Sequence, residues 1–146
     1  MISEHLAAAL QDAGLRWNPT AGDRFVIPQP ELDGELFTLS EMTIEAREYP
    51  TGTVLGFNGT TEWALDSVAQ DDTLWMPRED QLRDRLGGTF VALVRGTTPD
   101  GALDGWRVTT RAPSGELLEH QGETAADAYA LALLTLIRQA VDAAPS

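Results

Sequence analysis

The chain has 146 residues, a length that fits one domain with a buried core. Its ten basic residues, all arginine, face 23 acidic residues, which gives a formal net charge of −13. Such a surface repels phosphate backbones, so we expect no nucleic-acid partner. The missing lysine excludes a standard Walker A nucleotide site and Schiff-base enzymes, and the missing cysteine excludes disulfides and thiolate metal sites.

The first third of the chain predicts one helix followed by short strands. Apolar residues recur at helical spacing over residues 2–13, and Gly14 is a suitable residue to end that helix. Residues 25–27 form a short strand before Pro28, which we expect at a sheet edge. Residues 36–48 alternate as strands with a break at Ser40 and Glu41, and residues 53–57 return after a turn at 50–52.

The middle of the chain predicts two short helices. The first is capped by Thr60 or Thr61 and runs through Trp63 to Val68. The second begins with Pro77 as its first helical residue and ends before the two glycines at 87 and 88. Acidic residues in its first turn and arginines in its last turn complement the helix dipole.

The last third predicts three strands and the strongest helix. Residues 89–95 are apolar on both faces, which indicates a central strand, and residues 106–111 and 116–121 alternate as two more. A long helix follows from Thr124, its N-cap, to about Val141, with Asp127 in the position of a capping box. Leu131 lies inside the polar stripe of this otherwise apolar helix.

These elements predict a single α+β domain over residues 1–146. We expect a mainly antiparallel sheet of about five to six strands with helices on one face, including the long C-terminal helix. No apolar run is long enough to span a bilayer, and the first ten residues carry no lysine or arginine of a secretory signal. We therefore expect a cytoplasmic protein with no membrane partner.

Three runs of sequence carry a family resemblance: GLRWNPTAGDRFVIP, FNGTTEWALDS and LWMPREDQLRDRLGG. Together they resemble an uncharacterised actinobacterial family, some members of which carry a pilus-assembly label, over about residues 2–137. An assembly ATPase would need a nucleotide site, which a lysine-free chain does not provide in its standard form. The chain is also similar, more weakly, to small phage-encoded proteins of unknown function. Neither resemblance implies a catalytic residue.

Catalytic motifs are missing from the sequence. It contains no Gly-x-Ser-x-Gly, His-Glu-x-x-His or Gly-x-Gly-x-x-Gly pattern, and its two histidines are His5 and His120. His5 is expected at the surface of the first helix. A Ser114–His120 couple can be drawn, but Ser114 belongs to a Pro-Ser-Gly turn and no third partner is suggested. We predict no catalytic residue and no cofactor.

Two acidic clusters are candidates for a hard cation, which takes oxygen ligands. One is Glu31, Asp33 and Glu35 in a Pro- and Gly-rich loop, and the other is Asp71 with Asp72. Neither has the extended pattern of an EF-hand loop, and 23 acids in 146 residues produce such clusters by chance. A solvated loop is the simpler interpretation, and we predict no metal site.

The four tryptophans, at positions 17, 63, 75 and 106, predict core residues first and interface residues second. Trp75 and Met76 are our candidates for a partly exposed interface, together with Leu131 for self-association. The predicted function is a non-enzymatic binding or accessory protein that acts through protein–protein contacts, with a protein partner or a second copy. The alternative is a small carboxylate-based enzyme, or a ligand or metal binder, whose acids are remote in sequence.

Overall fold

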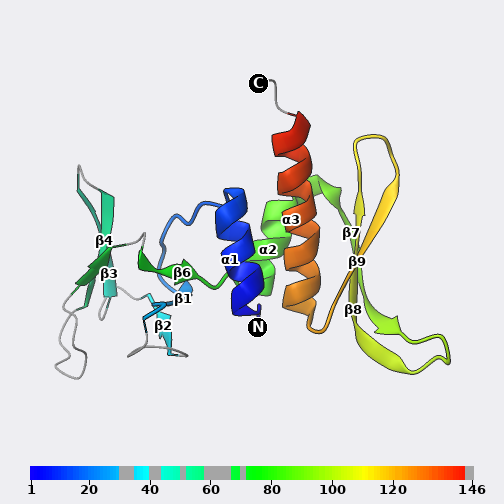
Figure 1. Ribbon diagram of the computed structural model, residues 1–146, viewed down its shortest axis with the longest axis horizontal. Helices are drawn as coiled ribbons and strands as arrows, with labels where there is room; N and C mark the ends of the chain where they lie inside the picture. Colours follow the sequence, from blue (N-terminus) through cyan, green and yellow to red (C-terminus); the bar gives the residue numbers. More distant parts are fainter. Residues whose placement is uncertain (30–34, 40–43, 50–51, 58–66, 70–71, 144–146) are drawn as a thin grey trace. The chain divides into compact units, whose positions relative to one another are not determined.

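The computed structural model describes residues 1–29, 35–39, 44–49, 52–57, 67–69 and 72–143 (Figure 1). The chain divides into two compact units, and the single domain over residues 1–146 stays a prediction. The helix–sheet unit comprises residues 1–15 and 77–146, and the strand unit comprises residues 16–76. We describe each unit by itself.

The α+β class, the antiparallel pairing and the long C-terminal helix are confirmed. The strands differ from the predicted single sheet, because the described residues form three separate three-stranded antiparallel sheets. No helix in the described part of the chain is long and apolar enough to cross a membrane.

The helix–sheet unit contains three helices, one 3₁₀ turn and a three-stranded meander. Its elements are α1 (Glu4–Ala13), α2 (Glu79–Leu86), η3 (Gly87–Thr89), β7 (Phe90–Thr97), β8 (Leu103–Arg111), β9 (Leu117–Gly122) and α3 (Ala125–Ala143). The strand order is β7-β8-β9. Helix α3 packs against β8 and β9 on one side and against α1 and α2 on the other (Figure 1).

Helix α3 has the predicted N-cap, Thr124, whereas the carboxylate of Asp127 binds Ser3 and not the N-cap amide of a capping box. The Thr124 hydroxyl oxygen accepts a hydrogen bond from the Asp127 N–H at 3.1 Å, which satisfies one free amide of the first turn. The Asp127 carboxylate accepts a hydrogen bond from the Ser3 N–H at 2.8 Å, so it ties the start of α1 to α3. Alanines at 126, 128, 130 and 132 are buried, and their small side chains allow the neighbouring elements to pack closely against α3.

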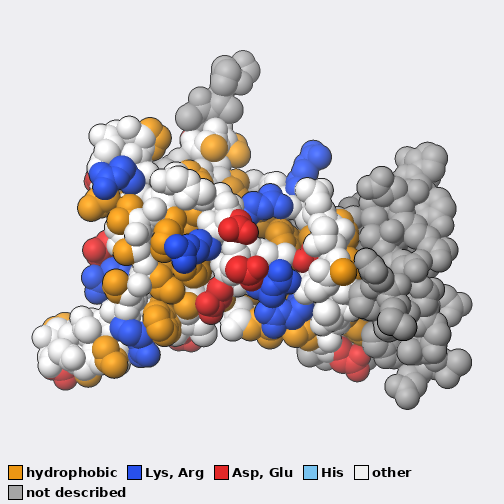
Figure 2. Space-filling model, turned by 180° about the vertical axis from the view of Figure 1, so that it is seen from behind, with side chains coloured by type: hydrophobic (Ala, Val, Ile, Leu, Met, Phe, Trp, Pro, Cys, Tyr) orange, Lys and Arg blue, Asp and Glu red, His pale blue; other side chains and the backbone are white. Residues whose placement is uncertain are grey.

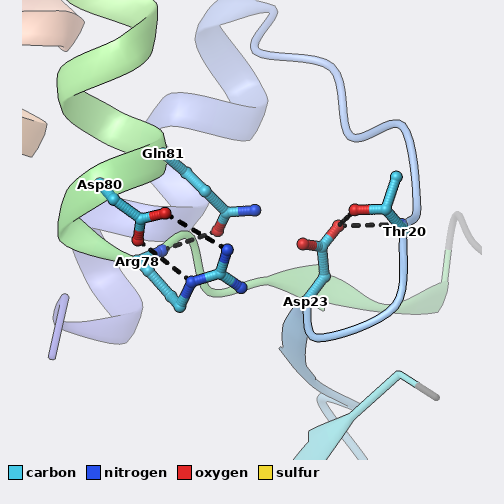
Figure 3. A network of polar contacts seen from close by, with 5 residues as sticks. All are labelled: Thr20, Asp23, Arg78, Asp80 and Gln81. Atoms are coloured by element: carbon cyan, nitrogen blue, oxygen red, sulfur yellow. Dashed lines mark hydrogen bonds and ion pairs between the residues drawn. The ribbon is translucent and has the colours of Figure 1, made fainter.

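Helix α2 starts two residues later than predicted, at Glu79, and Pro77 precedes it. The Arg78 N–H donates to the Gln81 side-chain oxygen at 2.9 Å, and the Arg78 guanidinium pairs with Asp80 at 3.1 Å (Figure 3). The hydrogen bond from the Arg78 guanidinium holds the pKa of the Asp80 carboxyl below its ordinary value. Leu82 and Leu86 are the buried pair of this helix, as predicted.

The strand unit contains two small sheets. One has the order β2-β1-β6, formed by β2 (Leu36–Thr38), β1 (Arg24–Val26) and β6 (Leu74–Trp75). The other has the order β3-β4-β5, formed by β3 (Ile44–Tyr49), β4 (Gly52–Phe57) and β5 (Ser67–Ala69). The predicted hairpin between residues 48 and 53 is confirmed, with Tyr49 opposite Gly52.

Two predictions for the strand unit are wrong. Strand β1 is the centre of its sheet and not an edge, because it ends at Val26 and Pro28 therefore removes no ladder hydrogen bond. Val68 belongs to strand β5 and not to a helix, because it pairs with Leu55 of β4. The rest of that predicted helix, and the predicted break at Ser40 and Glu41, lie outside the described residues.

Aromatic side chains and one carboxylate form the core of the strand unit. The Trp17 ring stacks on Trp75 at 6.3 Å and tilts against Phe25 at 5.5 Å. Asp23 is 1% exposed, and its Oδ2 accepts hydrogen bonds from Trp17 Nε1 at 2.9 Å and from the Thr20 N–H at 3.0 Å (Figure 3). These bonds offset the cost of burying a carboxylate and fix the turn before β1.

Candidate interaction surface

The β7–β8–β9 sheet has one covered face. Its cross-strand rows are Leu93–Val108–His120 and Phe90–Thr110–Leu118, as the pairing of the three strands places them. Val108 in the middle of this face is 0% exposed, and Thr110 is also buried. We call this the inner face. The alternation predicted for residues 106–111 is confirmed here, because even-numbered residues of β8 point inward.

Helix α3 covers the inner face. The ring of Tyr129 lies 5.8 Å from that of Phe90, and burial raises the pKa of the Tyr129 hydroxyl. At the end of β9, a Cβ added to Gly122 would lie 2.5 Å from the Ala128 amide nitrogen. No real side chain tolerates that distance, so β9 and α3 are in backbone contact there.

The opposite face carries three cross-strand rows with no other element of the helix–sheet unit over them. They are Val94–Arg107–Gln121, Ala92–Thr109–Glu119 and Arg111–Leu117. We call these eight residues the open face. Val94 is 44% exposed and Leu117 is 52% exposed. Outside residues 40–71, seven large apolar side chains of the described residues are exposed, and four of them lie on these strands: Val91, Val94, Leu103 and Leu117.

Strand β7 was predicted to be central, and this prediction is wrong. It is an edge strand, and β8 lies in the middle of the sheet. The two-faced apolar pattern of residues 89–95 normally indicates a strand covered on both sides. Here one of those two apolar faces is the open face. The apolar residues of β7 that face away from α3 therefore lie on an uncovered surface, although the sequence pattern predicts that they belong to the core.

Arginines accompany the apolar side chains on this sheet. Arg107 pairs with Glu119 at 3.7 Å, and the Arg111 guanidinium donates to the Gly115 carbonyl at 3.5 Å. The Arg95 guanidinium lies 4.7 Å from the centre of the Trp106 ring, in the row Arg95–Trp106–Gly122, which belongs to the other face of the strands. Figure 2 shows apolar side chains with arginines among them over the part of the helix–sheet unit that holds the strands. The open face thus bears two arginines and one carboxylate in a chain of net charge −13.

The residues predicted as an interface lie elsewhere. Trp75 is 9% exposed and Met76 is 2% exposed, so the expected partial exposure of this segment is not found. Trp75 is covered by its stacking on Trp17 and by its place opposite Phe25 in the sheet. Leu131 is half-buried in α3, and its carbonyl accepts a hydrogen bond from the Thr135 hydroxyl. As interface residues, all three stay predictions.

The acidic clusters provide no assembled site among the described residues. Glu35 and Asp72 are exposed, whereas Glu31, Asp33 and Asp71 lie outside the described residues. No group of three metal-ligating side chains occurs in the described part of the chain. An open hollow of about 490 Å³ lies between the last turns of α1 and α3. It is lined by Asp12, Asp142 and Arg138 with three apolar residues, and both aspartates are exposed.

The two histidines have separate surroundings. His5 is exposed on α1, as predicted. His120 is on the inner face, 3.3 Å from the Thr110 hydroxyl, and burial lowers its pKa. The Ser114 hydroxyl accepts a hydrogen bond from the Glu116 N–H within its turn. The two members of the imagined couple therefore have different hydrogen-bond partners.

Comparison with known proteins gives no match: no family model fits the chain, and no curated protein and no solved structure is significantly similar to it. The resemblances to an actinobacterial family and to phage-encoded proteins stay predictions.

Proposed function

We propose that this chain is a non-enzymatic binding or accessory protein that acts through protein–protein contacts made by the open face. The observation that carries the proposal is the contrast between the two sides of one sheet. Helix α3 covers the inner face, while Val94 and Leu117 stand 44% and 52% exposed on the other face. Exposed apolar patches rimmed by polar residues mark interaction sites in soluble proteins.

The charges of the open face indicate the chemistry of the partner. Arg107 and Arg111 lie in the rows with Val94 and Leu117, and Glu119 is the one carboxylate among the eight residues. A complementary surface would present apolar side chains next to carboxylates. Arginine suits such contacts, because its planar guanidinium binds a carboxylate in two parallel hydrogen bonds.

A capture experiment with matched variants tests this function. The wild-type chain, a Val94→Ser/Leu117→Ser variant and a Val141→Ser control would each be used to capture proteins from the source cell. Val141 is exposed on α3, away from the sheet strands, so the control removes one exposed apolar side chain from another surface. We expect at least one protein to bind the wild type and the control but to lose about tenfold in affinity for the double variant, measured with the purified partner.

A partner that binds all three chains equally would contradict the proposal, and so would a screen in which no protein depends on the open face. Circular dichroism would show that the double variant is folded. Arg107→Glu is a second variant with a different chemistry, and we expect it to weaken binding to a carboxylate-bearing partner by about tenfold as well.

The alternative, a carboxylate-based enzyme, has less support in the described residues. Asp23 is a fully buried carboxylate, and it accepts hydrogen bonds from Trp17 and Thr20. Such bonds fit a structural role in the strand unit. Cytoplasmic location and the absence of a nucleic-acid partner remain part of the proposal, on the grounds of charge and composition alone.

A further inference from the structure

The two edges of the β7–β8–β9 sheet differ in regularity. β7 leaves its register with β8 twice, around Val91 and around Gly96. β9 pairs with β8 in unbroken register from Leu117 to Gly122. Bulges blunt an edge strand against further pairing, whereas a regular edge without proline or lysine offers its backbone to another strand. Of the two edges, β9 is therefore the one suited to accept a strand.

The hairpin geometry shows which backbone groups of β9 point outward. The Ala112 N–H donates to the Glu116 carbonyl at 2.8 Å and begins the ladder between β8 and β9. Hydrogen-bonded pairs alternate along an antiparallel ladder, so residues 118, 120 and 122 direct their backbone groups toward β8. Residues 117, 119 and 121 direct theirs to the free edge. No described residue forms a backbone hydrogen bond to that edge outside the β8–β9 ladder.

We propose that β9 of one copy pairs antiparallel with β9 of a second copy across a two-fold axis at His120, which joins two three-stranded sheets into one sheet of six strands. The pairing uses the backbone edge of β9 together with Glu119 and Gln121, which border the open face, and it adds a second copy of the chain that the proposed function does not require. It places two open faces side by side on one continuous sheet.

The sequence of β9 is complementary to itself in this register. With His120 at the axis, Glu119 lies opposite Gln121 of the second copy, and the same pair recurs on the other side of the axis. These residues carry the outward backbone groups, so the two pairs also exchange about four N–H···O bonds. The neighbouring register, centred on Glu119, would put two carboxylates directly opposite each other and is disfavoured.

The charge of the chain acts against association at long range. Each copy carries a net charge of −13, so two copies repel at low ionic strength. Added salt screens this repulsion over distances of about 10 Å or more. We therefore expect the dimer to tighten between about 0.05 and 0.5 M salt, the opposite of an association held by surface ion pairs.

The first test uses proline at an outward amide. Gln121→Pro removes an N–H that points away from β8, so the β8–β9 ladder of the single chain keeps its bonds. Gln121→Ala keeps the N–H and loses the same side chain, and it is the matched control. Sedimentation velocity up to about 1 mM chain should show a dimer for the wild type and the control, and a monomer for Gln121→Pro.

The second test reads the register and stays decisive if the proline variant does not fold. Gln121→Arg would face Glu119 of the second copy twice and should tighten the dimer about threefold or more, whereas Gln121→Glu should weaken it by a similar factor. The two charge variants should have the opposite effects on the stability of the single chain, because Arg107 lies opposite position 121. Glutamate there should stabilise the monomer and arginine should destabilise it, so effects on folding and on dimerisation can be separated.

Three results would overturn the inference: a wild-type chain that stays monomeric to about 1 mM at 0.5 M salt, a folded Gln121→Pro variant that still dimerises, or charge variants that change dimerisation equally or in the opposite order. The proposed function is tested apart from this with Val94→Ser alone, because Val94 lies on β7, away from the paired edge of β9, and this variant should dimerise like the wild type. Loss of partner binding in that dimeric variant would separate the two surfaces.

Discussion

The two faces of the β7–β8–β9 sheet share the same strands and nearly the same apolar residue types, yet they differ in burial. Val108 on the inner face is fully buried, whereas Val94, on the next row of the neighbouring strand, is 44% exposed. The difference arises from α3, which packs on β8 and β9 from one side. Residue type along a strand therefore does not decide burial, and the proposed function depends on the face that no helix covers.

The largest expected effect comes from placing a carboxylate on each face. Val108→Asp puts a carboxylate into the core between β8 and α3, opposite His120, whose lowered pKa makes it a poor cationic partner near neutral pH, and we expect a loss of about 4 kcal/mol in the free energy of unfolding. Val94→Asp lies opposite Arg107 on the open face and should change stability by about 0.5 kcal/mol or less. Denaturant unfolding followed by circular dichroism measures both.

Similar losses for the two variants would mean that both faces are covered in solution. If only the Val94→Asp loss grew with protein concentration, a second copy would be the cover.

The contact between β9 and α3 gives the next effect. Gly122→Ala would bring a Cβ to 2.5 Å from the Ala128 nitrogen, so strand and helix must separate, at a cost of about 1–3 kcal/mol. Gly88→Ala is the matched control, because nothing lies within 4 Å of its added Cβ. Thermal unfolding of the two variants should therefore differ clearly. An unchanged midpoint for Gly122→Ala would show that α3 does not press on the inner face at this point.

Removing the N-cap of α3 should reduce the stability of the protein by a smaller amount. Thr124→Ala removes the hydroxyl oxygen that accepts the Asp127 N–H, and we expect a loss of about 1 kcal/mol. Thr124→Ser keeps the acceptor and should restore most of the stability. Amide exchange in the first turn of α3 would locate the change, and equal exchange in the alanine and serine variants would argue against capping.

Local signals in the sequence predicted several elements well. The cap at Thr124, the charges of α2 and the turn before β4 each depend on neighbouring residues, which a sequence displays directly. Sheet position depends on distant partners instead. The sequence predicts β1 at the edge of a sheet and β7 in the centre of one. In the structure β1 is central and β7 is an edge strand, because strand order is decided by tertiary pairing. The open face was missed for the same reason: the pattern of β7 shows apolar faces but not which one α3 covers.

The smallest expected effect is the pH dependence of the inner face. Burial lowers the pKa of His120 below its ordinary value of 6.5, so at mildly acidic pH the unfolded chain binds a proton that the folded chain resists. The neutral imidazole of His120 therefore contributes most to stability above the pKa that this group has in the unfolded chain. The free energy of unfolding falls as the pH decreases from about 7 toward the lowered pKa of His120 in the folded chain. His120→Gln removes this dependence, and His5 is present in both chains. The stability of the wild type relative to that variant should decrease from pH 7 to pH 5. If the stability difference between the two chains stayed constant from pH 7 to pH 5, His120 would be exposed to water. The inner face would then be uncovered at β9, and the contrast between the two faces would not hold at that strand.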